Sequence, residues 1–254
     1  MRHDSWRDAL FLHFEVDAAA LGASLPEHLV PDLFEGKAYA SVVALSEVGI
    51  APALPAWVPG GVARALKLSH DAVNARAYVR PAAGGGAPGI FFFSLDCSGA
   101  LPALGARALF NLPYRLARMR RSPTTFESAP AVGGGGPFYV EWAAGLQAPA
   151  PAPPGSRAAF LVERYRLYNE AGLALRPAMP RFGPGLWVGR ITHAPWPLVD
   201  ARVTALTGAA ALLEAHGLRP LSPDPAAAHF SPGVADIAFF WAPLPAPGSS
   251  GTRS

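Results

Sequence analysis

Arg76 is the residue whose chemistry and setting best suit the recognition of a small acid. It lies in the segment Val73–Arg80, where small apolar residues alternate with polar ones. Successive side chains of a strand point to opposite faces, so a strand here collects its polar groups on one face. A guanidinium on that face can hold a carboxylate through two parallel hydrogen bonds. We therefore assign Arg76 to substrate binding, together with its polar neighbours Asn74 and Tyr78. A half-exposed strand is the alternative.

Two residues are candidates for proton transfer. Tyr114 stands next to Arg115, whose charge could acidify the phenol, although a packed tyrosine with a satisfied hydroxyl is the alternative. His193 precedes the sequence Pro-Trp-Pro, and an imidazole titrates near neutral pH. Its alternative is a histidine hydrogen-bonded within a rigid turn. We assign Tyr114 and His193 as catalytic candidates and Arg115 as a substrate-binding residue.

Glu163 is the remaining member of the predicted binding site. It interrupts the aromatic run Phe160–Tyr168 and is followed by Arg164. Charges in such a run seldom stay unpaired, so these two residues are expected to form an internal ion pair or network. Arg76 has a structural alternative as well, in which it pairs with Asp96 or Glu163.

The composition excludes several classes of site. The single cysteine excludes an internal disulfide, and the seven histidines show no His-x-x-x-His spacing, so we expect no metal site and no cofactor. The formal charge is only +3, and no long basic tract is present, which argues against a nucleic-acid partner. No signal peptide and no apolar run long enough to span a membrane are visible, so a cytoplasmic protein is expected.

The candidate residues require a strand-rich scaffold to position them. The 28 prolines and 26 glycines, in a chain that is 51% hydrophobic, predict many short elements around a large core. We predict a mainly β fold with short helices outside, as a single domain over residues 1–243 with a flexible tail over 244–254.

Residue pattern then predicts the individual elements. Strands are expected at 9–16, 73–80, 90–93, 138–142, 186–192, 201–206 and 234–241, and segments 29–34 and 38–48 are expected to pair as a hairpin across the turn Glu35-Gly36. Helices are expected at 18–25 after Asp17, at 101–109, and at 209–216 before Gly217. A basic run follows over 114–121.

Seven short motifs in one order resemble the bacterial DUF2071 (YqjF-like) family over roughly residues 5–240. They are Trp6 with Leu10, Phe11 and His13; Leu25-Pro26 and Gly36-Lys37-Ala38; Asn74, Arg76, Tyr78 and Val79; Phe92 to Asp96; Leu112-Pro113-Tyr114; Glu163-Arg164-Tyr165 with Leu167-Tyr168; and His193 with Pro195 to Leu198. That family is grouped with the acetoacetate decarboxylase-like fold. The resemblance implies an antiparallel barrel or cone with helices outside and a small-molecule cavity within, and it is compatible with a homo-oligomer.

The resemblance also tests one mechanism. Acetoacetate decarboxylase forms a Schiff base through a lysine, and the matching position here is Tyr114, which cannot supply a primary amine. The chain's two lysines, Lys37 and Lys67, lie in other motifs. A glutamate expected two residues before Asn74 is replaced by Ala72. Decarboxylation through a Schiff base is therefore not expected.

Two functions from different classes remain open. The first is an enzyme that acts on a small oxo or hydroxy acid without a Schiff base, with Arg76 as carboxylate clamp and Tyr114 or His193 transferring a proton. The second is a non-catalytic barrel that binds a small acidic or apolar ligand. A weaker third is a filled barrel that works through the basic surface over 115–121.

Overall fold

The computed structural model describes residues 2–51, 59–65, 67–83, 86–99, 112–130, 136–170 and 186–243. The predicted helix at 101–109 and the predicted tail at 244–254 lie outside these residues. Within them, no helix is long and apolar enough to cross a membrane.

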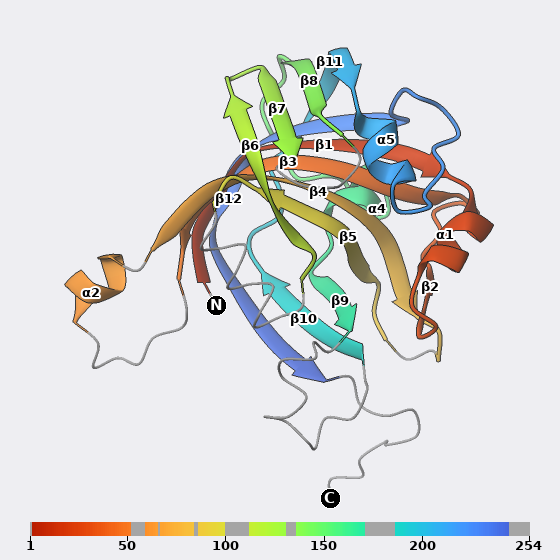
Figure 1. Ribbon diagram of the computed structural model, residues 1–254, viewed down its shortest axis with the longest axis horizontal. Coiled ribbons are helices and arrows are strands. Elements are labelled where there is room, and N and C mark those ends of the chain that lie inside the picture. The colour runs from red at the N-terminus through yellow and green to blue at the C-terminus, as the bar shows by residue number, and fades with distance from the viewer. Residues whose placement is uncertain are drawn as a thin grey trace, which may run out of the picture.

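The architecture is one large, mostly antiparallel sheet with short helices at its margins (Figure 1). Its strands are β1 (Arg2–Val16), β2 (Leu29–Pro31), β3 (Ala38–Ile50), β4 (Leu68–Pro81), β5 (Gly89–Cys97), β6 (Tyr114–Arg121), β7 (Thr125–Pro130), β8 (Phe138–Ala144), β9 (Arg166–Glu170), β10 (Leu186–Thr192), β11 (Val199–Thr207) and β12 (Ala227–Pro243). The helices are α1 (Ala18–Ser24), α2 (Gly60–Ala65), α4 (Arg157–Val162) and α5 (Ala209–Glu214). The predicted mainly β class with short helices is confirmed.

The strand pairing closes on itself twice. Strands β12, β1, β3, β4 and β5 are joined in that order and form a shared layer. One closure runs from β5 through β9 and β10 back to β12, and we call it the cavity ring. The other runs from β5 through β6, β7, β8 and β11 back to β12, and we call it the aliphatic ring. Figure 1 shows the shared layer curving between β9 and β10 on one side and β6, β7, β8 and β11 on the other.

Alternation along the shared strands gives each ring its own core. On β3, Val42 and Ala44 pack into the core of the aliphatic ring, while Val43 and Leu45 pack into the core of the cavity ring. The same division holds on β1, where Leu10 and Leu12 face away from Phe11. Because side chains alternate with period two, these strands are buried on both faces.

Local signals fix two of the helices beside this layer. Asp17 accepts a hydrogen bond from the Ala20 amide at 2.7 Å, which caps α1 as its sequence predicts. Ser156 accepts from the Ala159 amide at 3.1 Å and caps α4 in the same way. Helix α4 ends at Val162, so Glu163 and Arg164 follow directly at the wall of the cavity ring.

Two sequence expectations are wrong, and one element was not predicted. The predicted turn at Glu35-Gly36 forms, closed by a bridge between Phe34 and Lys37, but the predicted hairpin does not extend beyond it. Strand β2 pairs with β4, while β3 pairs with β1 and β4. The segment Val73–Arg80 is no half-exposed strand, because β4 lies between two neighbours and is buried from Ala72 to Val79. The basic run at 114–121, for which the sequence predicted no element, is strand β6, with Ala117 buried and Arg118 and Arg120 exposed.

Candidate functional site

A cavity of about 70 Å³ lies inside the cavity ring. Strands β1, β3, β4, β5, β6, β9, β10 and β12 contribute to its wall, and Leu112, the end of α4 and the segments that follow α4 and β10 complete it. Its lining residues are His3, Trp6, Phe11, Val43, Leu45, Glu47, Asn74, Arg76, Ile90, Phe92, Leu95, Leu112, Tyr114, Val162, Arg164, Leu167, Ile191, His193, Trp196 and Phe239. A mostly apolar wall with a few convergent polar groups is typical of a small-molecule site.

Arg76 is a buried cation without an anionic partner among the described residues. Its side chain comes from β4, is 9% exposed and faces the cavity, and its Nε and Nη2 atoms have no hydrogen-bond partner. The guanidinium carbon lies 5.5 Å from the centre of the Phe11 ring. Burial lowers the pKa of Arg76, yet a guanidinium stays charged at neutral pH. These N–H groups are therefore free to bind an anion.

The predicted structural partners of Arg76 are engaged elsewhere. Asp96 binds Arg115, with 2.6 Å between Arg115 Nε and Asp96 Oδ1. Glu163 accepts a hydrogen bond from the Trp196 amide at 2.9 Å and another from the Tyr165 hydroxyl. The interpretation of Arg76 as one half of an internal ion pair is therefore wrong.

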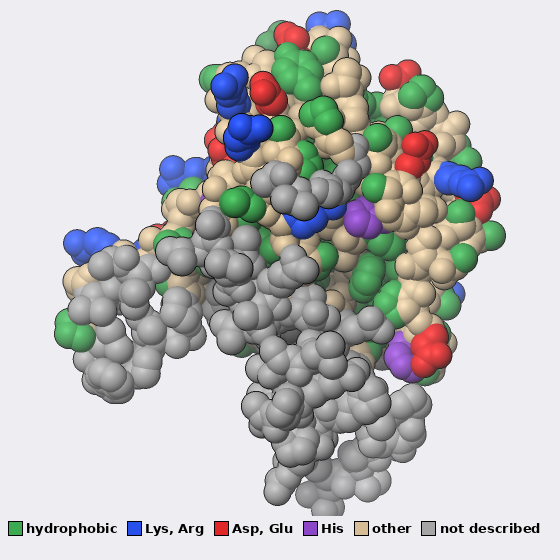
Figure 2. Space-filling view, in the orientation of Figure 1, with side chains coloured by type: hydrophobic (Ala, Val, Ile, Leu, Met, Phe, Trp, Pro, Cys, Tyr) green, Lys and Arg blue, Asp and Glu red, His purple; other side chains and the backbone are tan. Residues whose placement is uncertain are grey.

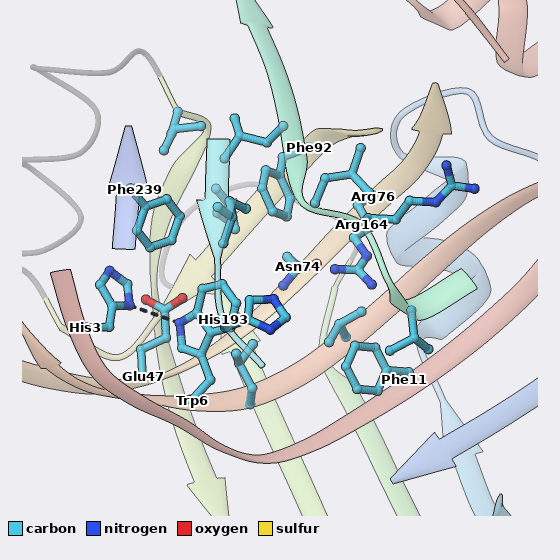
Figure 3. A pocket seen from close by; sticks show the side chains of 18 of the residues that line it. His3, Trp6, Phe11, Glu47, Asn74, Arg76, Phe92, Arg164, His193 and Phe239 are labelled. Atoms are coloured by element: carbon cyan, nitrogen blue, oxygen red, sulfur yellow. Dashed lines mark hydrogen bonds between the residues drawn. The ribbon is translucent and has the colours of Figure 1, made fainter. Parts of the chain in front are cut away.

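Asn74 and Arg164 lie beside Arg76 in the cavity wall. Asn74 is 5% exposed, and its Oδ1 atom has no hydrogen-bond partner. Arg164 pairs with Asp32, at 2.8 Å between Nη1 and Oδ2, and its Nε donates to the Phe160 carbonyl at 2.6 Å. Arg164 and Glu163 thus belong to separate networks and do not form the predicted pair. Figure 3 shows Asn74, Arg76 and His193 turned toward the same space.

His193 is set up as a neutral base. Its Nδ1 atom lies 2.6 Å from the Ala194 carbonyl oxygen, and a carbonyl can only accept, so Nδ1 carries the proton. Burial lowers the pKa of His193, which keeps the ring neutral at pH 7. The ring packs against Tyr165, Trp196 and Trp6, at centroid distances of 4.9, 5.3 and 5.5 Å. The Nε2 lone pair is therefore available in a fixed orientation at the cavity.

Tyr114 reaches the cavity but is not acidified. Burial raises its pKa well above the ordinary value, and the charge of Glu47 raises it further. Arg115, the predicted source of acidification, is bound to Asp96 instead. The expectation of a phenol with a lowered pKa is wrong, because Tyr114 lies near a carboxylate and has no free guanidinium beside it. As a neutral phenol it can still donate a hydrogen bond.

Three predicted binding residues do not line the cavity: Tyr78, Arg115 and Glu163. Tyr78 lies behind the wall, where its hydroxyl donates to the Leu161 carbonyl at 2.7 Å and also contacts Ser41 and His13, at 2.6 and 3.0 Å. His13 is likewise fully buried in this network. Glu163 holds the segment that carries Trp196. These residues support the wall rather than contact a ligand.

Sequence reasoning missed a polar group at the far end of the cavity, formed by His3, Glu47 and His70. Glu47 is 8% exposed and lines the cavity, and its Oε2 atom lies 3.3 Å from His70 Nε2. Trp6 Nε1 donates to His3 Nδ1 at 2.9 Å. The available signal was a carboxylate inside the long apolar segment Ala38–Val48, at a position that alternation assigns to the same face as Val43 and Leu45.

The described residues offer no amine and no metal cluster at this site. Both lysines are at the surface, where Lys37 pairs with Glu15 at 2.8 Å and Lys67 pairs with Asp4 at 2.7 Å. No group of three or more His, Cys, Asp and Glu side chains among the described residues is arranged to hold a metal ion. Covalent chemistry through a lysine has no donor here.

The basic run of β6 is a weaker candidate. Arg115 pairs with Asp96, and Arg121 lies 3.6 Å from Asp71, so two of its charges have internal partners. On the face shown in Figure 2, Lys and Arg side chains are scattered among Asp and Glu side chains. This face therefore has no continuous basic patch, and the cavity is the stronger candidate for a functional site.

Comparison with known proteins places this chain in one family. The family model DUF2071, described as an uncharacterized conserved protein, matches residues 3–235. The uncharacterized protein YqjF of Bacillus subtilis (strain 168) is 31% identical over 225 residues, which cover 87% of this chain and 84% of that protein.

Solved structures with the same fold are more distant in sequence. The enduracididine biosynthesis enzyme MppR, complexed with pyruvate, has a TM-score of 0.58 at 14% identity and covers 95% of this chain and 90% of its own. An acetoacetate decarboxylase-like enzyme from Sphingomonas wittichii RW1 has a TM-score of 0.52 at 15% identity, covering 94% of this chain and 92% of its own. An acetoacetate decarboxylase has a TM-score of 0.54 at 13% identity, covering 96% of this chain and 88% of its own.

Proposed function

This chain belongs to the DUF2071 family and has the acetoacetate decarboxylase-like fold, and from that premise we propose that it is an enzyme acting on a small oxo or hydroxy acid inside the cavity ring. The acid's carboxylate binds Arg76 and its neighbour Asn74. His193 then accepts a proton from the bound acid, and no covalent link to the protein forms.

The single observation that carries the proposal is the unpaired guanidinium of Arg76. A buried charge without a partner destabilises the folded state, so such groups are kept where a ligand compensates them. The two unpartnered atoms, Nε and Nη2, are spaced to bind the two oxygens of one carboxylate. The apolar wall strengthens this pair because it excludes water.

His193 and Tyr114 supply the remaining chemistry in the proposal. In an oxo acid, the carbon next to the carbonyl carries an acidic proton. His193 Nε2 takes that proton, and the electron pair left on carbon moves to the carbonyl oxygen as an enolate. Arg76, which already holds the adjacent carboxylate, stabilises the developing negative charge. Tyr114 is a neutral donor at the other side of the cavity, so its role is a hydrogen bond and not proton removal.

A structural neighbour offers support for the choice of ligand. The enzyme MppR, which shares this fold, is described as complexed with pyruvate, an oxo acid. At 14% identity this likeness concerns the fold alone. The ligand class for the present chain rests on Arg76.

A thermal-shift series tests the proposal. Purified protein is melted with pyruvate, longer oxo acids, the matching hydroxy acids and unsaturated acids, beside Arg76→Ala. A ligand present at about 100 times its Kd stabilises the folded state by about 2.7 kcal/mol. We expect stabilisation by one acid class and none in Arg76→Ala. If no acid shifts a protein that melts cooperatively, the proposal is wrong.

A second variant separates catalysis from binding. His193→Gln keeps a polar side chain of similar reach but has no basic nitrogen. We expect it to bind the acid found in the screen with unchanged affinity. The protons on the carbon next to the acid's carbonyl should exchange with solvent at least about 100-fold more slowly than with the wild type. Proton exchange followed by NMR in deuterated buffer measures this directly.

A non-catalytic barrel is the second candidate, favoured by one observation. Most of the wall is apolar, and Arg76 with such a wall is sufficient for binding. This alternative predicts the same thermal shifts. It also predicts that neither the wild type nor His193→Gln accelerates exchange of the protons on the carbon next to the acid's carbonyl. The exchange experiment therefore distinguishes the two functions.

A further inference from the structure

The cavity carries a second buried ionisable side chain, a carboxylate, at its other end. Glu47 on β3 is buried and lines the cavity, as Arg76 does on β4. Figure 3 shows the Glu47 carboxylate between His3 and Trp6, away from Arg76 and Arg164. The proposed function uses Arg76 and leaves Glu47 unexplained.

Glu47 is an ionised carboxylate. Burial by itself raises its pKa, but the contact with His70, at 3.3 Å, outweighs burial, so its pKa lies below the ordinary value. Its Oε2 atom has no hydrogen-bond partner, because the contact with His70 Nε2 lacks hydrogen-bond geometry. A carboxylate in this state attracts a cationic donor.

His3 does not balance that charge. The Trp6 indole N–H donates to His3 Nδ1 at 2.9 Å, so Nδ1 must carry a lone pair and the ring must be neutral. Burial lowers the pKa of His3, in agreement with this hydrogen bond. His70 is the only other basic side chain in contact with Glu47 among the described residues, and neither of its ring nitrogens has a hydrogen-bond partner.

The two charges are too far apart to neutralise each other. In the β3–β4 register, Arg76 lies opposite Ser41, whereas Glu47 lies opposite His70. Ser41 and Glu47 are six residues apart on one strand, a separation of about 20 Å between their Cα atoms. Both side chains project into the same cavity, which shortens the gap between their charged groups. A ligand could therefore contact both ends only if its own charges stood several bonds apart.

We propose that the cavity binds a linear acid that carries a protonated amine at the opposite end, with the carboxylate on Arg76 and Asn74 and the ammonium group on Glu47. This inference rests on the proposed function and specifies its substrate class. An α-amino acid does not fit, because its two charged groups share one carbon. A dicarboxylate does not fit either, because its second carboxylate meets Glu47.

Calorimetric titration of the wild-type protein with matched acids tests the inference. The ligands are butanoate, hexanoate and octanoate, their ω-amino derivatives, 2-aminohexanoate and hexanedioate. A hydrogen bond between charged groups in a buried site makes the ω-amino acid of best length at least about tenfold tighter than its unsubstituted partner. We expect 2-aminohexanoate and hexanedioate to bind more weakly than hexanoate.

Glu47→Gln assigns the preference to one carboxylate, since glutamine keeps the size of glutamate and removes its charge. We expect the affinity ratio between the ω-amino acid and its unsubstituted partner to fall to about one. Glu127→Gln, at an exposed position on β7, is the matched control and should keep the wild-type ratio.

The outcomes are distinguishable. If unsubstituted and ω-amino acids bind equally to the wild type, His70 alone balances Glu47, and the amine subsite is wrong while the carboxylate site stands. A preference that persists in Glu47→Gln also overturns the subsite. If none of these acids binds, the amine subsite is wrong, and the thermal-shift series with oxo and hydroxy acids decides the proposed function separately.

Discussion

The two faces of the shared layer differ in the polar side chains that they carry among their apolar ones. On the side of the aliphatic ring, β1, β3 and β4 contribute Leu, Val, Ala and Phe side chains, which pack against Phe126, Phe138 and Trp142. On the side of the cavity ring, the same strands contribute Glu47, Asn74 and Arg76 beside their apolar residues. One set of strands therefore provides stability on one face and unsatisfied polar groups on the other.

A second comparison lies within the cavity itself. Arg164 has Asp32, the Phe160 carbonyl and the Phe160 ring as partners, the ring centre lying 4.0 Å from its guanidinium carbon. Arg76 has two uncharged neighbours, the ring of Phe11 at 5.5 Å and the hydroxyl of Tyr78, and its Nε and Nη2 atoms have no hydrogen-bond partner. Two arginines in one wall thus differ in their partners: Arg164 has an anionic partner and one unpartnered nitrogen, Nη2, whereas Arg76 has no anionic partner among the described residues. Arg76 is therefore the better suited of the two to hold an anionic ligand.

Removing a side chain from the aliphatic core should give the largest loss of stability. Phe126 is fully buried there, so Phe126→Ala is expected to lower the free energy of unfolding by about 3–5 kcal/mol. Urea denaturation measures this. Phe92→Ala, at a partly buried position in the cavity wall, is the matched variant and should cost less stability while changing acid binding. If both variants lose the same free energy of unfolding, the two faces do not differ in how much they stabilise the fold.

Arg164→Met should destabilise the protein. It breaks the pair with Asp32 and removes the hydrogen bond to Phe160, for an expected loss of about 1–3 kcal/mol in the free energy of unfolding. Chemical denaturation monitored by tryptophan fluorescence measures the loss. An unchanged stability would mean that Arg164 is no better satisfied than Arg76.

Arg76→Met should instead raise the free energy of unfolding. Replacing an unpaired buried charge with an apolar side chain of similar length removes a desolvation cost, so we expect a gain of about 1–2 kcal/mol in the absence of ligand. The same denaturation experiment measures it. A loss comparable to that of Arg164→Met would indicate a structural partner for Arg76.

Acid should weaken the fold through histidines on the cavity side. Burial lowers the folded-state pKa of His3, His13 and His193, so below about pH 6.5 the unfolded chain binds more protons than the folded one. Stability is therefore fully present above that pH and falls as the pH decreases. For fully buried His13 the slope approaches about 1.4 kcal/mol per pH unit. Denaturation at pH 7.5, 6.0 and 5.0 measures this slope, and a flat profile would contradict it.

Much of the fold was predictable because its signals are local. Strand β10 lies at the predicted residues 186–192, and the Asp17 cap forms the predicted helix start. The pairing of β2 was not predictable in this way, because a turn at Glu35-Gly36 does not reveal which distant strand completes the sheet. Strand β6 was missed because its pattern contains four arginines, two of which are exposed.

The site was predictable only in part, for a related reason. Alternation in Val73–Arg80 was sufficient to bring Asn74 and Arg76 to one face, and both line the cavity. It also assigned Tyr78 to that face, but Tyr78 is covered by α4 through its hydrogen bond to Leu161. The partners of Arg115 and Glu163 depend on contacts between strands far apart in sequence, and so does the group formed by His3, Glu47 and His70.

The most direct test of the account is to measure the unfolding free energy of the wild type and Arg76→Met, each with and without the tightest-binding oxo acid. We predict that the order of stability reverses. Without the acid the variant is the more stable protein, and at about 100 times the Kd the wild type gains about 2.7 kcal/mol and becomes the more stable one. The same order in both conditions would contradict the claim that Arg76 is kept unpaired in order to bind a carboxylate.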